Sequence, residues 1–151
     1  MSDKWHKRYL KLAKEVATWS RDPSRKIGAV TVGSIGEVLS QGYNGFPRGI
    51  NDSDERYNDR ETKYRYVVHA EMNCIYNATY TGTSLADSTL YVHGLPVCSE
   101  CAKGIIQTGI KEVFWTVDED IPDRWTNSYA TTKNMLREAG INITYVNMGD
   151  D

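Results

Sequence analysis

Apolar side chains near the start of the chain recur with a helical period. Trp5, Tyr9, Leu12, Val16 and Trp19 follow one another at steps of four, three, four and three residues. Such steps place side chains on one face of an α-helix. We predict an amphipathic helix that ends near "SRDP" and packs by this stripe, either onto the core or against another subunit.

Two apolar runs and a polar excursion follow. "KIGAVTV" and "EVLSQGYN" have the composition of strands, and "GSIG" between them supplies turn residues, so we predict a β-hairpin. Residues 45–64 then alternate charges and turn residues with no sustained period. We expect an irregular loop there, and a loop this long within a domain is usually functional or flexible.

The second half of the chain alternates between helical and strand patterns. "VVHAEMNCIYNA", "CSECAKGIIQTG" and "SYATTKNMLREAG" predict helices, and "STLYVHG", "IKEVFWTV" and "INITYVN" predict strands. Gly109 and Gly140 mark helix ends. This alternation favours helices on both faces of one mostly parallel sheet, with the opening hairpin as an antiparallel pair. We expect a single domain over residues 1–151.

Composition narrows the class of partner. A net charge of −2 argues against a broad cationic surface for a nucleic acid polymer. No apolar run approaches the roughly 18 residues of a membrane helix, and the first residues do not resemble a secretion signal. We therefore expect a soluble intracellular protein with small-molecule partners. Three cysteines, an odd number, do not suggest a disulfide framework, which leaves metal binding or a core position for each.

Two of these cysteines have the spacing of metal ligands. Cys98 and Cys101 stand three positions apart at the start of a predicted helix, where free backbone N–H groups and the helix dipole favour thiolates. Such a pair is a common half of a zinc site. A redox pair would require a thioredoxin-like context, which this stretch lacks.

The remaining ligands must be sought among three histidines and one further cysteine. We interpret His6 as a solvated surface residue and His93 as a loop or packing residue, whereas His69 begins a helix of its own and can face the cysteine pair. Three ligands would leave the fourth zinc position open, as in catalytic sites. Cys74 could close that position and make a structural site, but its apolar neighbours indicate a core thiol.

Glu71 follows His69 by two positions and has three possible roles. It could be a fourth ligand, an exposed helix glutamate, or a base that takes a proton from a zinc-bound water.

Together these residues resemble a known family. "HAE", followed 29 residues after its histidine by "CSEC", resembles the zinc-dependent nucleobase deaminases, whose pattern is H-x-E and then P-C-x-x-C. The resemblance implies that zinc is held by His69, Cys98 and Cys101, and that Glu71 carries protons during attack of water on C4 of cytosine. It also implies a three-layer α/β/α, cytidine deaminase-like fold with a five-stranded mixed sheet. One departure is that Val97 stands where the family usually has proline.

The first half of the chain extends the resemblance to one branch of the family. "SRDPSRKIGAV", "GYNGFPRG" and "KYRYVVHAEMN" resemble the dCMP deaminases of bacteria and their viruses. This implies conversion of dCMP to dUMP and ammonia, a step that supplies thymidylate synthesis. It also implies a homo-oligomer, often a hexamer, in the cytoplasm, which is the host's cytoplasm if the source is a virus.

The same branch carries an effector site at the "GYNG" segment. There dCTP activates and dTTP inhibits, with a magnesium ion, and Gly42, Tyr43, Asn44 and Gly45 are the matching positions here. Taken alone, an Asn-Gly pair at the end of a strand is also ordinary turn chemistry.

A nucleotide substrate requires groups that bind its phosphate and its base. Arg25 and Lys26, before the first strand, are our candidates for the phosphate, and Arg48 is a further cation nearby. Asn44 is assigned to the sugar hydroxyl or base, and the backbone of Ala70 to the pyrimidine edge as in the family.

Aromatic pocket walls and other functions remain open. Trp125 and Tyr129 could wall a pocket or belong to the core or an interface. A tRNA adenosine deaminase shares the zinc motif but favours a basic, polymer-binding surface. A free cytidine deaminase would lack the phosphate cations and the "GYNG" loop, and a deaminase of another cytosine nucleotide or nucleoside stays an alternative. A non-catalytic zinc module would need Cys74 as a ligand, and Glu71 would then be dispensable.

Overall fold

The computed structural model describes residues 2–150, so the two end residues of the predicted domain lie outside the described part. Five strands form one sheet in the order β2-β1-β3-β4-β5. In chain order the strands are β1 (Gly28–Val32), β2 (Val38–Tyr43), β3 (Thr89–His93), β4 (Glu112–Thr116) and β5 (Asn142–Tyr145).

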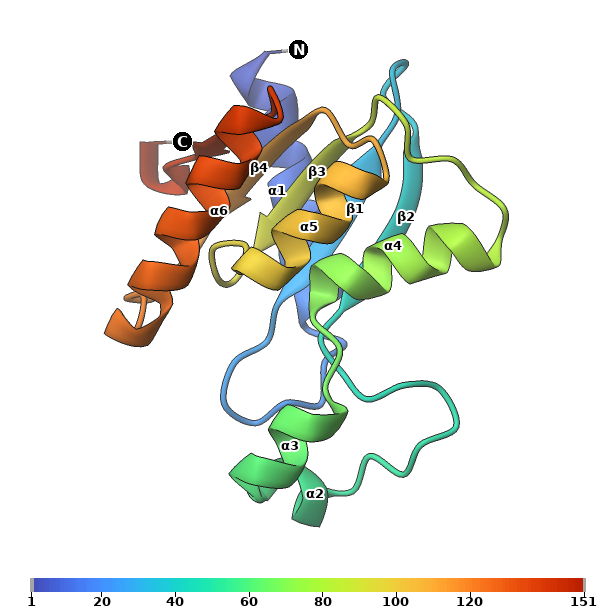
Figure 1. Ribbon diagram of the computed structural model, residues 1–151, viewed down its shortest axis with the longest axis vertical. Helices are drawn as coiled ribbons and strands as arrows, with labels where there is room; N and C mark the ends of the chain where they lie inside the picture. Colours follow the sequence, from blue (N-terminus) through green and yellow to red (C-terminus); the bar gives the residue numbers. More distant parts are fainter. Residues whose placement is uncertain (1, 151) are drawn as a thin grey trace.

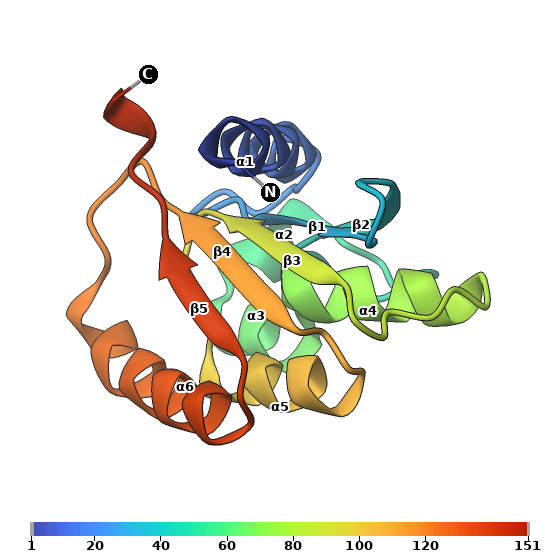
Figure 2. The same cartoon turned by 90° about the horizontal axis from the view of Figure 1, so that it is seen from above.

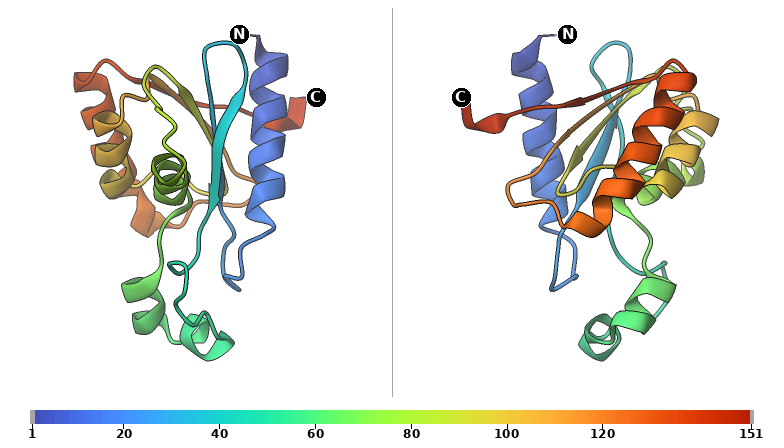
Figure 3. Two further views of the ribbon diagram at one scale, coloured as in Figure 1. Left: turned by 90° about the vertical axis from the view of Figure 1, so that its right-hand side faces the viewer. Right: turned by 60° about the vertical axis from the view of Figure 1, so that its left-hand side comes forward.

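Helices cover both faces of this sheet. The α-helices are α1 (Asp3–Ala17), α2 (Asp54–Asn58), α3 (Arg60–Tyr66), α4 (Ala70–Tyr80), α5 (Ser99–Gln107) and α6 (Thr126–Glu138), with short 3-10 turns η1 (Asp123–Trp125) and η2 (Met148–Asp150). Helix α1 lies on one face and α4, α5 and α6 lie on the other, whereas α2 and α3 extend beyond one end of the sheet (Figures 1, 2 and 3). The predicted three-layer α/β/α fold is confirmed. Within the described chain, none of the helices has the length and apolarity to cross a bilayer.

The sheet is mixed. The predicted hairpin is confirmed as the antiparallel β1–β2 pair, and β3, β4 and β5 pair in parallel. Strand β1 also pairs antiparallel with β3, which the order of elements did not predict because strand partners far apart in the sequence are chosen by tertiary packing. Both β1 and β3 are buried along their whole length, since helices cover both faces of the sheet there.

The predicted apolar stripe of α1 is only partly buried. Tyr9 and Val16 are buried, but Trp5, Leu12 and Trp19 are 43%, 38% and 51% exposed. The structure therefore confirms packing onto the core for Tyr9 and Val16, and contact of the other three side chains with another subunit stays a prediction.

Small residues explain which face of α1 is buried. Leu10, Ala13 and Ala17 are buried beside the sheet. A Cβ atom on Gly28 would lie 2.0 Å from the Ala13 carbonyl oxygen and 2.5 Å from the Ala17 nitrogen. Helix α1 thus approaches β1 closely at its two alanines, because glycine in the strand leaves room for the helix backbone.

The prediction of an irregular loop over residues 45–64 is partly wrong, because residues 54–58 and 60–66 form α2 and α3. The Ser53 hydroxyl accepts a hydrogen bond from the Arg56 nitrogen and caps α2. Tyr57 is buried and stacks on Phe46 with ring centroids 4.3 Å apart. Helices this short show no periodic pattern in the sequence, and tertiary contacts such as this stacking stabilise them.

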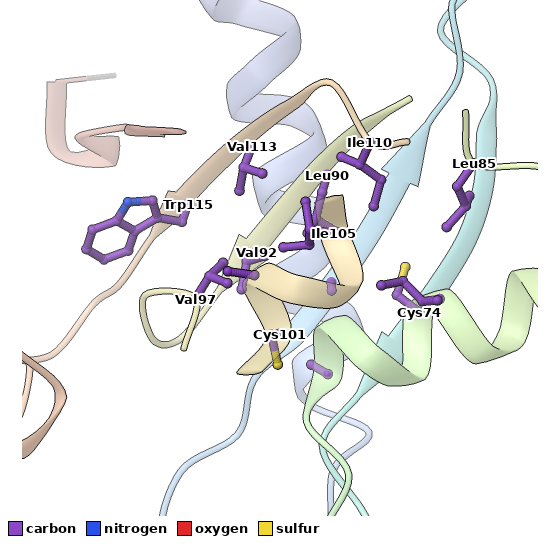
Figure 4. Packing of buried hydrophobic residues seen from close by; sticks show 14 of the residues in the cluster. Cys74, Leu85, Leu90, Val92, Val97, Cys101, Ile105, Ile110, Val113 and Trp115 are labelled. Carbon is purple, nitrogen blue, oxygen red and sulfur yellow. The ribbon is translucent and has the colours of Figure 1, made fainter. Parts of the chain in front are cut away.

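The core between the sheet and helices α4, α5 and α6 is apolar and includes Val97 (Figure 4). Val97 is fully buried, and its carbonyl accepts a 2.9 Å hydrogen bond from the Thr132 hydroxyl on α6. The departure from the family pattern before Cys98 is therefore a packing position, at which an apolar side chain fills the core.

Candidate functional site

The N-termini of α4 and α5 bring the three predicted ligands together. His69 caps α4, Cys98 caps α5, and Cys101 lies in the first turn of α5. The Nδ1 atom of His69 is 3.3 Å from Sγ of Cys98 and 3.4 Å from Sγ of Cys101. Ligands on tetrahedral zinc, with bonds of about 2.0 and 2.3 Å, are about 3.5 Å apart, so the three side chains fit zinc.

The charge state of the two thiols also fits a cation. A hydrogen bond from Cys101, and further interactions with His69, lower the pKa of Cys98 to about 4. The same sulfur–sulfur hydrogen bond and burial raise the pKa of Cys101. One thiolate therefore forms readily and the second does not, and a bound cation would stabilise both. The hydrogen bond to Cys98 also raises the pKa of His69, to about 9.

Cys74 and His93 lie outside this ligand group among the described residues. Cys74 is fully buried, its Sγ lies 3.3 Å from the Ser40 hydroxyl, and burial raises the pKa of its thiol to about 11. This confirms Cys74 as a core thiol. His93 is buried, with Nε2 3.3 Å from an Asp118 carboxylate oxygen, which confirms a packing role.

The interpretation of His6 as a solvated residue is wrong. Its ring stacks on Phe114 at a centroid distance of 3.9 Å, and its Nδ1 lies 2.7 Å from the Tyr91 hydroxyl. Helix α1 packs onto the sheet at this position, so a polar ring in a charged stretch becomes half-buried.

Glu71 is a buried acid beside the ligands. It is 4% exposed, which excludes the exposed-glutamate interpretation, and it is not a member of the described three-residue ligand group. Burial raises the pKa of its carboxyl to about 7, against the opposing effect of His69. A carboxyl with this pKa can both accept and donate a proton near neutral pH, as an acid–base group requires.

A pocket opens above the ligand group, and its lining includes His69, Glu71 and Cys98. Three of the predicted substrate residues, Arg25, Asn44 and Ala70, also line this pocket. Lys26 does not. Its side chain hydrogen-bonds the Ser20 carbonyl and lines a neighbouring cavity with His93.

Only one of the two aromatic residues predicted as pocket walls lines the pocket. Trp125 lines the pocket, and its ring packs edge-on to His69 at a centroid distance of 6.4 Å. Tyr129 does not line it, and its hydroxyl accepts a 2.9 Å hydrogen bond from the indole nitrogen of Trp115. Arg48 also lies outside the pocket and contacts Asn77.

Asn44 organises one side of the pocket. Its side-chain oxygen accepts from the Ile27 nitrogen at 2.9 Å, and its amide donates to the Arg25 carbonyl at 2.9 Å. It is 4% exposed. Asn44 therefore fixes the backbone that carries Arg25 while it faces the pocket.

Sequence reasoning missed a buried ion pair in the pocket wall. Lys63 on α3 lies 2.9 Å from a carboxylate oxygen of Asp22, which is 3% exposed and also accepts from the Ser24 nitrogen at 2.8 Å. Lys63 falls within the predicted irregular loop, and its distance from Asp22 along the chain gives no signal of this contact.

The "GYNG" segment has a structural role at the end of β2, where the sequence analysis also allowed for an ordinary turn. A Cβ atom on Gly42 would lie 2.3 Å from the Cys74 nitrogen and 2.6 Å from the Ala70 carbonyl oxygen, so glycine lets β2 lie directly against α4. Gly45 exchanges two backbone hydrogen bonds with Val68, at 3.1 and 2.8 Å. Tyr43 is 40% exposed. These contacts position the site, and the effector role of the segment stays a prediction.

Comparison with known proteins supports the resemblance to zinc-dependent deaminases. Residues 3–117 match the family described as cytidine and deoxycytidylate deaminase zinc-binding region. A deaminase encoded in the luxG 3′ region of Aliivibrio fischeri is 36% identical over 97% of this chain and 96% of its own length. The human deoxycytidylate deaminase is 39% identical over 76% of this chain, and the aligned part is 66% of the human protein. This chain thus spans slightly less than two thirds of that relative.

A solved structure has the same fold over almost the whole chain. The dCMP deaminase of cyanophage S-TIM5, in complex with dCMP and dUMP, is 26% identical, covers 97% of this chain and 99% of its own, and superposes with a TM-score of 0.80. The matched family region contains the three grouped ligands and the buried glutamate. This chain therefore belongs to the cytidine and deoxycytidylate deaminases, a family of hydrolytic enzymes.

Proposed function

We propose that this chain hydrolyses dCMP to dUMP and ammonia, with zinc held by His69, Cys98 and Cys101. The observation that carries the proposal is the buried Glu71 beside these three grouped ligands, at a pocket with cationic walls. The names of the relatives, and the dCMP and dUMP bound in the cyanophage structure, support this choice of substrate.

Zinc in this site would supply Lewis-acid chemistry that lowers the pKa of a water molecule. Glu71 accepts the proton that the attacking water loses and delivers it to ring N3 of the cytosine. It then carries a second proton to the exocyclic nitrogen, which leaves as ammonia while the ring retains the oxygen. A carboxyl whose pKa is about 7 suits both transfers.

Other pocket residues would orient the nucleotide. Ala70 is the first residue of α4, where backbone N–H groups have no partner within the helix, and we assign its backbone to the pyrimidine edge. Asn44 is assigned to the sugar or base, and Arg25 to the phosphate. Lys26 lines the neighbouring cavity, so the structure gives its predicted phosphate role no support.

Regulation, assembly and location follow from the resemblance alone. We propose activation by dCTP and inhibition by dTTP with magnesium at Gly42, Tyr43, Asn44 and Gly45, together with a cytoplasmic homo-oligomer of hexameric type. The exposure of Trp5, Leu12 and Trp19 is consistent with an interface between subunits, because large apolar side chains gather at such surfaces.

One assay panel tests the proposal. The purified chain is analysed for zinc, and ammonia release is followed from dCMP, dCTP, cytidine and a tRNA anticodon stem, with and without dCTP or dTTP and magnesium. We expect one zinc per chain and turnover of dCMP. Glu71→Gln should abolish turnover and retain zinc, whereas Glu100→Gln, at an exposed acid that pairs with Lys103 on α5, should leave turnover unchanged. Normal turnover in Glu71→Gln would contradict the mechanism.

A further inference from the structure

The two zinc ligands that cap helices each follow an irregular stretch of chain, so their positions depend on what holds the residue before them. Before His69, Val68 exchanges two backbone hydrogen bonds with Gly45, at 3.1 and 2.8 Å. Before Cys98, residues 94–97 leave β3 and belong to no helix or strand. A support of another kind must therefore fix the backbone that leads to Cys98.

Val97 leaves the backbone before Cys98 freer than the usual residue of the family pattern does. Proline at this position, as in P-C-x-x-C, would lock its own φ at about −65°. Valine has no such ring, and Pro96, one position earlier, restricts only itself and the residue that precedes it. The chain next to the ligand can therefore rotate unless another group binds it.

Helix α6 supplies hydrogen bonds on both sides of Cys98. The Thr132 hydroxyl donates to the Val97 carbonyl oxygen at 2.9 Å, and Thr132 is fully buried. The Ser128 hydroxyl accepts from the Ser99 nitrogen at 2.9 Å. Ser128 and Thr132 are four positions apart, so they lie on one face of α6. One helix face thus holds the residue before the ligand and the residue after it.

The Ser128 hydroxyl also completes the start of α5. Ser99 is the first residue of this helix, and its backbone N–H has no partner within the helix. A capping side chain accepts from the second or third helical nitrogen, and Sγ of Cys98 accordingly lies 3.4 Å from the Cys101 nitrogen. The first nitrogen is bound from α6 instead, which fixes the first turn of α5 relative to α6.

Helix α6 is itself anchored, so it can serve as a support. It lies beside α5 on one face of the sheet (Figures 2 and 3). The Tyr129 hydroxyl accepts a 2.9 Å hydrogen bond from the indole nitrogen of Trp115 on β4, and Leu136 is fully buried in the core. A site supported by packed helices is held more precisely than one supported by loops alone.

We propose that Thr132 and Ser128 are positioning residues for zinc, and that their hydrogen bonds replace the backbone restraint that proline gives in the family pattern. This inference rests on the proposed metal site and adds two residues that the sequence did not suggest. Groups that orient metal ligands set the affinity for the metal, and their loss commonly weakens binding about 10- to 100-fold.

The test measures zinc affinity by competition with a chelator, at a temperature well below the unfolding transition of each variant. Thr132→Val keeps the shape of the side chain and removes its hydroxyl, and we expect zinc to bind about tenfold more weakly. Ser128→Ala should show a similar loss. Thr132→Ser keeps the hydroxyl and should retain most of the affinity. Unchanged affinity in Thr132→Val or in Ser128→Ala would overturn the role of that residue.

Two further variants on α6 separate positioning from general stability. Thr131→Val is the matched control, because the exposed Thr131 hydroxyl binds only the Asn127 carbonyl of its own helix, and it should leave zinc affinity unchanged. Leu136→Ala removes buried packing and touches neither hydrogen bond, so it should lower the melting temperature and keep the affinity. An equal loss of affinity in Leu136→Ala and Thr132→Val would show that Thr132 acts only through stability, which would overturn the proposal.

A double variant tests the link to proline. The loss of zinc affinity caused by Thr132→Val should be smaller in a Val97→Pro background than in the wild type, because the ring restores the restraint. The same loss in both backgrounds would contradict the replacement of proline by these hydrogen bonds.

The wild type distinguishes this inference from the proposed function. If it binds zinc with the affinities expected above but does not deaminate dCMP, the proposed reaction fails and the positioning role stands. If it binds no zinc, the proposed metal site and this inference fail together. If it binds zinc and deaminates dCMP while Thr132→Val binds zinc as tightly, only the positioning role of Thr132 is wrong.

Discussion

The Nδ1 atom of His69 lies 3.3 Å from Sγ of Cys98, although 29 residues separate the two in the chain. Each residue caps a helix, and the two helix starts meet at the floor of the pocket. This relationship turns two short motifs into one metal site, and it leads to the first prediction.

Removal of a ligand should remove zinc, and removal of the third cysteine should not. Cys98→Ser is expected to lower zinc well below one per chain and to lower the melting temperature, because structure stabilised by bound metal loses that contribution. Cys74→Ala should retain one zinc per chain and lose only packing energy, about 1 kcal/mol or more, since Cys74 lies in the core away from the ligands. Metal analysis and thermal unfolding of both variants check this. Loss of zinc from Cys74→Ala would instead indicate a closed structural site.

Gly42→Ala should destabilise the fold more than Gly45→Ala. A Cβ atom on Gly42 would meet the Cys74 nitrogen at 2.3 Å, whereas one on Gly45 would meet the Tyr57 hydroxyl at an ordinary 3.6 Å. Overpacking against backbone costs about 1–3 kcal/mol, and relief of the contact would move α4, which carries Glu71. We expect a lower free energy of unfolding and lower turnover for Gly42→Ala. Equal stability of the two variants in urea would show that β2 and α4 separate without cost.

The Asp22–Lys63 pair should stabilise the pocket wall. Lys63→Met leaves the carboxylate of Asp22, 3% exposed, without its cation, and such a change costs about 3–5 kcal/mol in a fully buried pair. Backbone hydrogen bonds to Asp22 and the partial exposure of Lys63 place the expected loss at the lower end of that range. The double variant Asp22→Asn, Lys63→Met should be less destabilised than the sum of the two single variants, as measured by chemical denaturation. Additive losses would mean that the two groups do not interact.

His93 should contribute stability that is lost as the pH drops through the range of histidine titration. Burial lowers the pKa of His93 in the folded protein, although Asp118 and Glu119 oppose this effect and Lys14 adds to it. The unfolded chain therefore binds a proton on this residue first, as the pH falls below about 6.5. The loss of stability continues until the pH is below the folded pKa and then stops.

The variant His93→Gln isolates this contribution. Between pH 7 and pH 5 the free energy of unfolding of the wild type should decrease relative to that of the variant, because only the wild type loses the contribution of His93. The opposite contribution of Glu71, whose pKa is raised to about 7 in the folded protein, is common to both proteins. Denaturant titrations at the two pH values measure these free energies. If the variant and the wild type show the same change between pH 7 and pH 5, His93 is excluded as a source of the pH dependence.

Several features were determined by the sequence itself. The H-x-E and C-x-x-C motifs each place their ligands at a helix start, and this local geometry follows from spacing and capping. The alternation of helix and strand patterns likewise predicted the three layers, because each pattern reports which face of an element is buried. The apolar neighbours of Cys74 predicted its place in the core for the same reason.

Other features depended on contacts between distant segments. Helix α1 meets β1 closely at Gly28, and Trp5 on this helix stays exposed, because the periodicity within α1 does not report the shape of its partner. Lys63 and Arg124 reach the pocket from segments far from His69, whereas Lys26, next to Arg25, faces a different cavity. The sequence predicts which faces of helices and strands are buried and how neighbouring ligands are spaced. The direction of a charged side chain on an irregular segment is set instead by the tertiary contacts that hold its backbone.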